Sequence, residues 1–126
     1  MKSLALRNAE VSFFFVSGRR MKGLNKRYKG KDTSTDVLAF SQIEGRRTPA
    51  VGPVVLGDVI ISVDDTRRQA PLYGNSFKKE LVLYMVHGTL HLLGHDDEKT
   101  APRKMMRREE DRIMKKIHRR FPDFWS

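Results

Sequence analysis

A run of eleven residues concentrates side chains that can bind a metal ion: His87-Gly88-Thr89-Leu90-His91-Leu92-Leu93-Gly94-His95-Asp96-Asp97. His87 and His91 are four positions apart, so on a helix both imidazoles project from one face and can reach one ion. Gly94 lets the chain turn back, and Asp97 can then approach the same ion as a third ligand. Three such ligands leave a fourth tetrahedral position for water, as in a catalytic zinc site.

Two other residues compete with Asp97 for the third position. His95 follows the turn by one residue, where the backbone has not yet come round to the metal, so Asp97 is favoured, and Asp96 ranks lower. An ordinary structural role for the two helical histidines is disfavoured, because two buried imidazoles on one face are hard to satisfy without a shared cation. His118 stands alone in a basic segment and is expected at the surface.

Gly88 bears on the kind of hydrolysis. Zinc proteases that use this histidine spacing carry a glutamate beside the first histidine, and that side chain activates water for amide cleavage. The glycine therefore argues against peptide hydrolysis. Asp96, Asp97 or a hydroxide at the metal is left as the general base.

The charge of the chain is strongly positive and unevenly placed. The net charge is +10; residues 1–31 hold nine Lys and Arg against one acid, and residues 99–126 hold ten against four acids. Basic flanks around an acidic centre suit a polyanion guided toward a cation site. Charge alone does not separate this interpretation from a basic surface that is merely solvated.

Composition sets further limits. The chain has no cysteine, so a metal must be held by histidine and carboxylate side chains. No segment approaches the ~18 uninterrupted apolar residues of a membrane span, and residues 11–16 are too short for a secretion signal. A length of 126 residues suits one compact domain. We therefore expect a single-domain, cytoplasmic protein without a membrane partner.

Hydrophobic patterning predicts an α+β fold, a small mixed β-sheet packed with helices. Strands are expected at residues 11–16, largely buried on both faces, and at 35–41 and 54–63. Gly57-Asp58 interrupts the third strand, which indicates a bulge or a close backbone approach. The stretch from Glu44 to Pro53 is rich in turn formers.

Helices are predicted at residues 19–29, 77–93 and from Thr100 onward, with a shorter helical turn at 64–71. The first helix should end near Gly30, and Asn75 or Ser76 should cap the helix at 77–93. The helix at 77–93 is apolar nearly all round, so we expect it to be central and buried, with both histidines inside. The last helix repeats Met106, Ile113 and Ile117 along one narrow face.

With these residues in place, the chain resembles the YbeY family of bacterial metal-dependent endoribonucleases, which act in ribosomal RNA maturation. The resemblance runs from about Val11 to Ile117. Four ordered motifs carry it: Leu24 through Asp32, Thr35-Asp36-Val37-Leu38-Ala39-Phe40, Leu56-Gly57-Asp58-Val59-Ile60-Ile61, and His87 through Asp96.

The resemblance implies the site. Zinc, one ion per chain, would be bound at His87, His91 and Asp97, with another divalent metal as the alternative. Asp97 stands where the family has a third histidine, which lowers the Lewis acidity of the site. Lys29 stands where the family has arginine and loses the bidentate fork. His87 and Lys29 are the expected catalytic residues.

The resemblance also implies the partners and the domain. RNA, above all ribosomal RNA, would contact Lys29, Lys31 and Arg27, and the small ribosomal subunit or its proteins would be further partners. Thr35 and Asp36 either orient the site or hydrogen-bond a ligand histidine, or they only begin a strand. Residues 1–126 would form one domain with a shortened N-terminus, in which residues 1–10 are a remnant of a family helix.

The functional hypothesis is therefore a zinc-dependent, single-strand-specific endoribonuclease in ribosomal RNA processing and ribosome quality control. Metal-activated water would attack the phosphodiester. A zinc metalloprotease is one alternative, which chelator-sensitive digestion of casein would support. A non-catalytic, ribosome-associated RNA-binding factor is the other, which RNA binding without cleavage would support.

Overall fold

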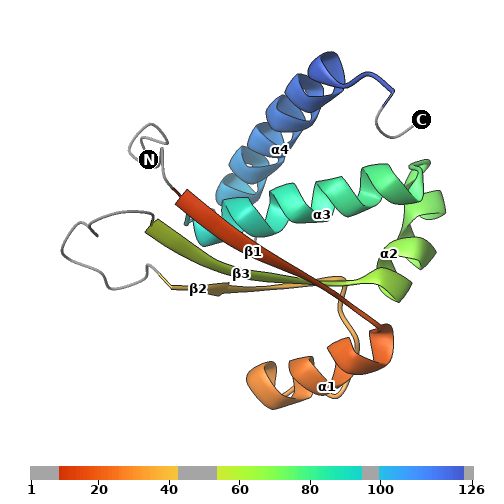
Figure 1. Cartoon of the computed structure of the whole chain (residues 1–126), viewed down its shortest axis with the longest axis vertical. Coiled ribbons are helices and arrows are strands. Elements are labelled where there is room, and N and C mark those ends of the chain that lie inside the picture. Colours follow the sequence, from red (N-terminus) through yellow and green to blue (C-terminus); the bar gives the residue numbers. More distant parts are fainter. Residues whose placement is uncertain (1–8, 43–53, 95–99, 124–126) are drawn as a thin grey trace.

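The computed structural model describes residues 9–42, 54–94 and 100–123 (Figure 1). The described elements are, in chain order, β1 (Ala9–Val16), α1 (Gly18–Lys29), β2 (Val37–Ser41), β3 (Val54–Ser62), α2 (Val63–Gln69), the 3-10 helix η2 (Ala70–Tyr73), α3 (Phe77–Leu92) and α4 (Thr100–Arg120). Each strand predicted at 11–16, 35–41 and 54–63, and each helix predicted at 19–29, 77–93 and from Thr100, has a counterpart whose ends differ by at most two residues where predicted, and the turn at 64–71 corresponds to α2 and η2. The predicted turn-rich stretch, residues 44–53, lies outside the described residues.

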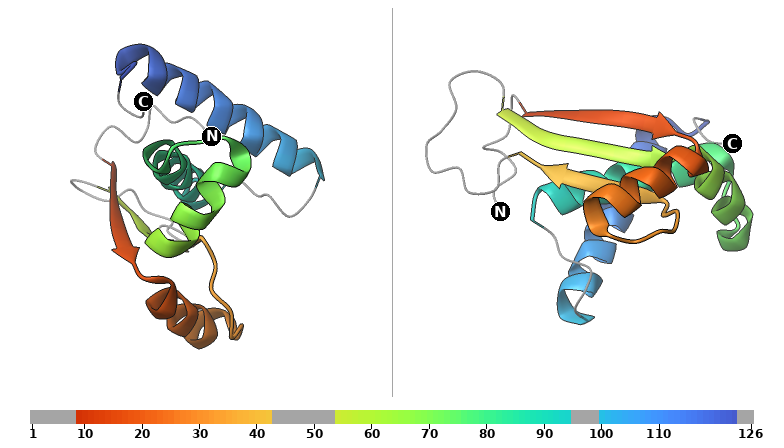
Figure 2. Two further views of the ribbon diagram at one scale, coloured as in Figure 1. Left: turned by 90° about the vertical axis from the view of Figure 1, so that its right-hand side faces the viewer. Right: turned by 90° about the horizontal axis from the view of Figure 1, so that it is seen from below.

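The three described strands form a mixed sheet in the order β1-β3-β2, with β1 parallel and β2 antiparallel to β3. Helix α1 lies below the sheet in Figure 1, α3 lies on the opposite face, and α4 covers the far side of α3. The view from below in Figure 2 shows α1 in front of the strands and α3 behind them. The α+β prediction is confirmed, and α3 is central because elements cover it on two sides.

The core lies between β3 and α3. Leu56, Val59, Ile61 and Leu92 are buried and in contact. Burying each of these side chains contributes about 1.5 to 3 kcal/mol relative to leaving it exposed. The inward-facing side chains of β3 therefore hold α3 against the sheet, and this packing also positions the histidines of α3.

Strand β1 departs from the prediction. Phe13 packs against the core, but Phe14 and Phe15 are 51% and 49% exposed. The expectation of burial on both faces is wrong, because β1 lies at an edge of the described sheet and pairs there only with β3. An apolar run predicts a strand without revealing whether neighbours flank it on both sides.

Gly57 confirms the predicted irregularity in β3. The β1–β3 register steps from Glu10 opposite Val55 to Val11 opposite Gly57, so Leu56 is an extra residue and forms a bulge. Gly57 has φ of 150°, and an added Cβ would lie 2.1 Å from the carbonyl oxygen of Phe40. Only glycine allows β3 to approach β2 this closely.

Local signals account for the helix ends. The Ser17 hydroxyl accepts a hydrogen bond from the Arg20 amide and begins α1, which ends at Gly30 with φ of 70°. On α4, Met106 is buried at 1% exposure and Ile113 is half-buried, as the predicted narrow face requires. Among the described helices, none is long and apolar enough to cross a membrane.

Candidate metal and RNA site

Helix α3 presents His87 and His91 on one face. Ser76 caps the helix by accepting a hydrogen bond from the Lys79 amide, and the helix ends before Gly94, whose φ is 97°. The two imidazole centroids are 6.2 Å apart, with ring planes inclined at 81°. The four-residue spacing therefore produces the predicted pair, on one face of the last two turns of α3.

The two histidines are not inside, and this part of the prediction is wrong. The His87 side chain is 24% exposed, and His91 is exposed. Hydropathy counts the apolar side chains of a helix but does not locate the ends of the elements that cover it. The imidazoles can consequently meet a ligand that arrives from solvent.

Glu110 of α4 contacts the pair. Its Oε1 lies 2.6 Å from Nδ1 of His87, and its side chain is only 14% exposed. A carboxylate accepts, so Nδ1 carries the proton and Nε2 of the neutral ring is the nitrogen whose lone pair a metal would bind. Carboxylates hold metal-binding histidines in this way in many proteins.

The sequence did contain a signal for Glu110. It follows Met106 by four positions, so both lie on the face of α4 that packs against α3. An acid on a packed face needs a partner, because burying an unpaired charge is costly. We did not predict its role, since the partner lies 23 positions away in another helix.

The donor chemistry of the described pair fits a zinc ion. Neutral imidazoles are borderline donors that zinc binds readily, and the carboxylate behind His87 favours the required tautomer. Within the described ranges no third His or acidic residue completes a group with them. The predicted third ligand Asp97 and its competitors His95 and Asp96 lie outside these ranges, so that ligand stays a prediction.

Gly88, between the histidines, faces the sheet. An added Cβ would lie 2.5 Å from Cγ1 of Val59, whose side chain is fully buried in β3. The glycine therefore allows α3 to pack closely on the sheet. A glutamate at this position, as in zinc proteases, would collide with Val59.

The predicted RNA-binding residues lie at the end of α1. Lys29, Lys31 and Arg27 are all exposed. The ammonium of Lys29 lies 5.9 Å from the Phe40 ring centroid, and the Arg27 guanidinium lies 5.5 Å from the Tyr28 ring centroid. Aromatic rings attract cations, and the two basic side chains remain exposed to solvent beside them.

The basic end of α1 and the histidine end of α3 meet the same end of the sheet from opposite faces (Figure 1). Phe40 contacts Tyr28 and Lys29 on the α1 side. Gly57, opposite Ser41 in the sheet, lies against the Phe40 carbonyl and the Leu92 side chain of α3. The fold thus brings residues separated by about sixty positions to one edge of the molecule.

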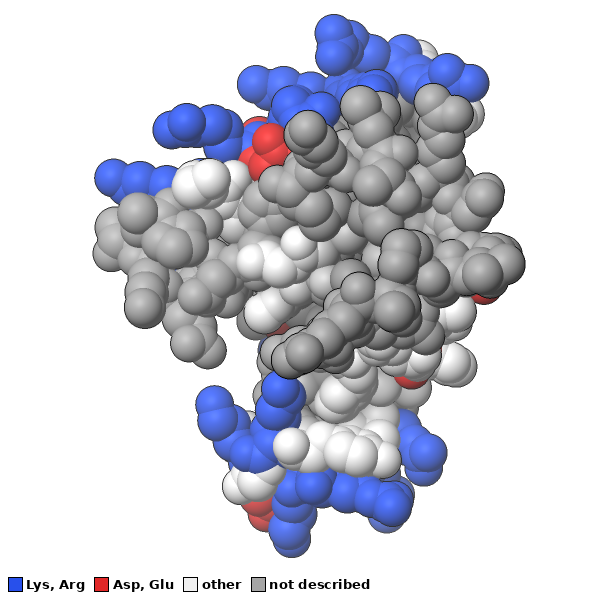
Figure 3. All heavy atoms as spheres, turned by 90° about the vertical axis from the view of Figure 1, so that its left-hand side faces the viewer, with Lys and Arg blue, Asp and Glu red and all other residues white. Residues whose placement is uncertain are grey.

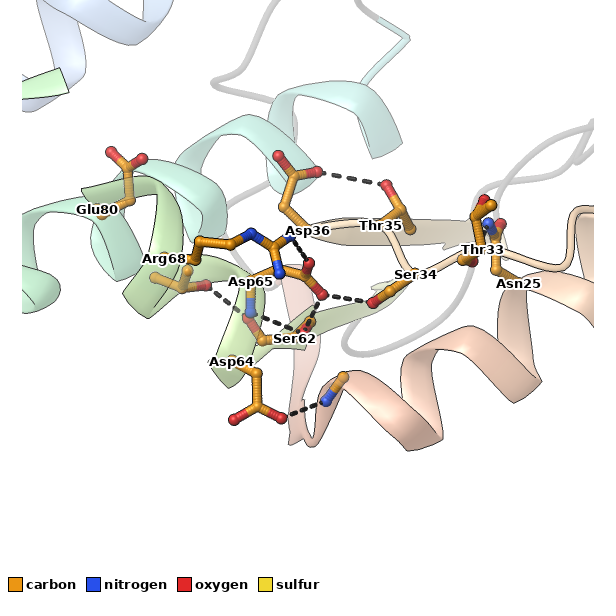
Figure 4. A network of polar contacts seen from close by, with 12 residues as sticks. Asn25, Thr33, Ser34, Thr35, Asp36, Ser62, Asp64, Asp65, Arg68 and Glu80 are labelled. Atoms are coloured by element: carbon orange, nitrogen blue, oxygen red, sulfur yellow. Dashed lines mark hydrogen bonds and ion pairs between the residues drawn. The ribbon is translucent and has the colours of Figure 1, made fainter. Parts of the chain in front are cut away.

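A polar network fixes the loop between α1 and β2 (Figure 4). Buried Asp65, in α2, accepts hydrogen bonds from the hydroxyls of Ser34 and Ser62 and from the Arg68 guanidinium. Burial by itself raises the pKa of this carboxyl, but these donors outweigh it and hold the pKa below its ordinary value. Asn25 of α1 donates to the Thr33 carbonyl at 2.8 Å, so two adjacent residues in the middle of the loop are held.

Asp36 connects the start of β2 with α3. Burial raises the pKa of the Tyr84 hydroxyl, and the Asp36 and Glu80 carboxylates raise it further, so the hydroxyl keeps its proton and donates a hydrogen bond to Glu80. The Thr35 hydroxyl lies 3.4 Å from an Asp36 oxygen. The structure gives Asp36 a partner one turn before His87, and its predicted bond to a ligand histidine stays a prediction.

His118, near the end of α4, is exposed, as predicted. The described features define a class of protein: a small α+β domain whose central helix presents a histidine pair to solvent, with basic groups on both sides of the sheet. A family model described as Endoribonuclease YbeY matches residues 1–118. The chain belongs to this family.

Individual relatives agree with this assignment. The chain is 43% identical to Endoribonuclease YbeY of Pelotomaculum thermopropionicum over 113 residues, which are 87% of this chain and 73% of that protein. It is 47% identical to Endoribonuclease YbeY of Desulfitobacterium hafniense, over 86% of this chain and 72% of that protein. The solution structure of TM1509 from Thermotoga maritima has a TM-score of 0.66 and 26% identity, over 95% of this chain and 75% of that one.

Proposed function

We propose that this protein is a metal-dependent endoribonuclease that cleaves single-stranded RNA, with one zinc ion per chain at His87, His91 and Asp97. The observation that carries the proposal is the solvent-facing imidazole pair with His87 held by Glu110. Relatives that align with most of the chain are named endoribonucleases. Another divalent metal is the alternative to zinc.

A bound zinc ion would supply Lewis-acid chemistry, activating water and polarising a phosphoryl oxygen. The chain's own residues do the rest. Glu110 holds the proton at Nδ1 of His87 and so orients the Nε2 lone pair. His91, one turn later, offers its ring from the same face of α3.

The basic residues would position the substrate. Lys29, Lys31 and Arg27 lie exposed at the edge of the sheet that α3 also reaches, where they can contact successive phosphates of one strand. Lys29 would be the catalytic member of this group. Its ammonium supplies charge without the fixed two-pronged geometry of a guanidinium, so we expect weaker orientation of the phosphate than an arginine would give.

We further propose that ribosomal RNA is the substrate, that cleavage serves its processing and ribosome quality control in the cytoplasm, and that the small ribosomal subunit is a partner. The strong positive charge at both ends of the chain supports an RNA substrate. Asp97 as third ligand would add a negative charge to the site and reduce its Lewis acidity.

Cleavage of an end-labelled single-stranded RNA tests the proposal. Wild type with zinc should cleave internally, and chelator, His87→Ala, His91→Ala and Asp97→Ala should each remove cleavage. Metal analysis on the same samples should give one zinc per wild-type chain and less in the variants. Tight RNA binding without metal-dependent cleavage would refute the nuclease and leave an RNA-binding factor. Chelator-sensitive digestion of casein would instead revive a protease.

A further inference from the structure

A polar pocket of about 350 Å³ lies beside His87. It is lined by His87, Arg103, Met106, Arg107 and Glu110. One lining residue comes from α3 and four come from the first half of α4, so the crossing of the two helices forms the pocket. Two of the four are arginines, although the pocket adjoins a histidine proposed to bind a cation.

The arginines form a matched pair. Arg103 and Arg107 are four positions apart on α4, so their guanidinium groups extend from one face of the helix, and both side chains are exposed. Met106 is 1% exposed and anchors this part of α4 in the core. The pair is therefore held on a fixed support but reaches into solvent, as an anion-binding subsite requires.

The acid of the pocket, Glu110, is directed at His87. Glu110 Oε1 lies 2.6 Å from Nδ1 of His87, and the Glu110 side chain is 14% exposed. Its carboxylate is thus engaged beside the imidazole, and both arginine residues are more exposed than Glu110. Two guanidinium groups at one pocket can donate to a phosphate, which such groups bind with two parallel hydrogen bonds.

We propose that Arg103 and Arg107 form a phosphate subsite that holds the RNA strand directly beside the histidine pair. The subsite is separate from the basic end of α1. Figure 3 shows the end of the molecule where Lys and Arg gather in one group over α4 and another over α1. A strand that contacts both groups would pass the end of the sheet at which α3 presents His87 and His91. This inference rests on the proposed function.

RNA binding without cleavage provides the test. A labelled single-stranded oligoribonucleotide is titrated with protein in chelator, and the dissociation constant is measured by fluorescence anisotropy at several salt concentrations. Arg103→Ala/Arg107→Ala should weaken binding at least about tenfold and reduce the salt slope by about 0.7 for each phosphate that the variant no longer neutralises. Arg103→Lys/Arg107→Lys should lose less, because it keeps the charge but not the fork.

The same helix supplies a matched control. Lys104 and Arg108 are also exposed and four positions apart, but they do not line the pocket. Lys104→Ala/Arg108→Ala removes the same charge and should weaken binding less than about twofold. Equal losses in the two alanine pairs, or no loss in either, would overturn the subsite. Competition by a polyglutamate peptide as strong as that by unlabelled RNA would overturn its assignment to RNA.

The outcome is independent of catalysis, since every binding measurement is made in chelator. If wild type fails to cleave RNA but the two pairs still differ in binding, the proposed function fails and the subsite stands. If wild type cleaves and the pairs bind alike, the subsite fails alone. Circular dichroism and thermal unfolding of each variant verify that it is folded.

Discussion

Nδ1 of His87 and Oε1 of Glu110 lie 2.6 Å apart and join α3 to α4 across 23 positions of sequence. The contact fixes the ring from behind, and a metal would bind the opposite nitrogen. An imidazole that is oriented before a metal arrives loses less conformational freedom on binding it. The pair therefore connects the packing of two helices with the affinity of the proposed zinc site.

Removing this carboxylate should weaken metal binding. Glu110→Ala is expected to lower zinc affinity about 10- to 100-fold, and Glu110→Gln less, because an amide oxygen still accepts from Nδ1. Competition with a chromophoric chelator measures the affinity without any cleavage assay. Glu109→Ala is the control, since that neighbouring acid pairs with exposed Arg112 at 2.8 Å instead. An affinity for Glu110→Ala within twofold of wild type would rule out this role.

Gly88→Ala should destabilise the fold. Its Cβ would lie 2.5 Å from Val59 in a filled core, and such overpacking costs about 1 to 3 kcal/mol. Urea unfolding measures the change. Gly23→Ala in α1 is the control, because a Cβ there meets nothing within 4 Å. That variant should gain about 0.5 to 1 kcal/mol from helix propensity.

A second substitution tests the cause of the Gly88 effect. Val59→Ala removes the methyl groups that the added Cβ would strike. The double variant should therefore be more stable than the sum of the two single losses predicts, with a coupling of about 0.5 to 3 kcal/mol. Strict additivity would show that Gly88 acts through the helix backbone and not through this contact.

Asp65→Asn should destabilise the chain in a pH-dependent way. At pH 7 the loss should be about 1 to 3 kcal/mol, because buried hydroxyl donors lose a charged acceptor. The folded pKa of Asp65 is lowered, so its contribution is complete above the unfolded value of about 3.9 and is lost as pH falls through the folded pKa. The difference in unfolding free energy between wild type and Asp65→Asn should consequently become smaller in acid.

Urea unfolding between pH 7 and pH 3 measures the difference in unfolding free energy between wild type and Asp65→Asn. Exposed Asp32 provides the comparison, and Asp32→Asn should change the unfolding free energy by less than about 0.5 kcal/mol at pH 7. If the destabilisation by Asp65→Asn stays constant across this pH range, a lowered pKa of Asp65 is not its cause.

Lys29 should contribute to RNA affinity through its charge. Lys29→Ala should weaken binding of single-stranded RNA and lower the salt slope by about 0.7, as expected when one fewer phosphate is neutralised. Lys29→Arg should bind at least as tightly as wild type, because the guanidinium adds a bidentate donor. Lys22→Ala removes the same charge two turns earlier on α1 and should matter less. Equal effects at Lys22 and Lys29 would assign the contribution to overall charge.

Much of this protein was determined by the sequence itself. The spacing of His87 and His91 placed them on one helix face, Gly57 marked the bulge, and the apolar runs predicted the strands and central helix. These features depend on local geometry and side-chain periodicity, which a linear pattern records directly. The four ordered motifs also led to the correct family.

Only the tertiary structure decided how these pieces meet. Glu110 became the partner of His87 because α4 crosses α3, and Gly88 proved to be a packing residue because β3 lies beneath it. β1 lies at a described sheet edge, and the histidines face solvent, because burial depends on where covering elements end. Contacts between residues distant in sequence follow from the packing of whole elements, and no local pattern contains that information.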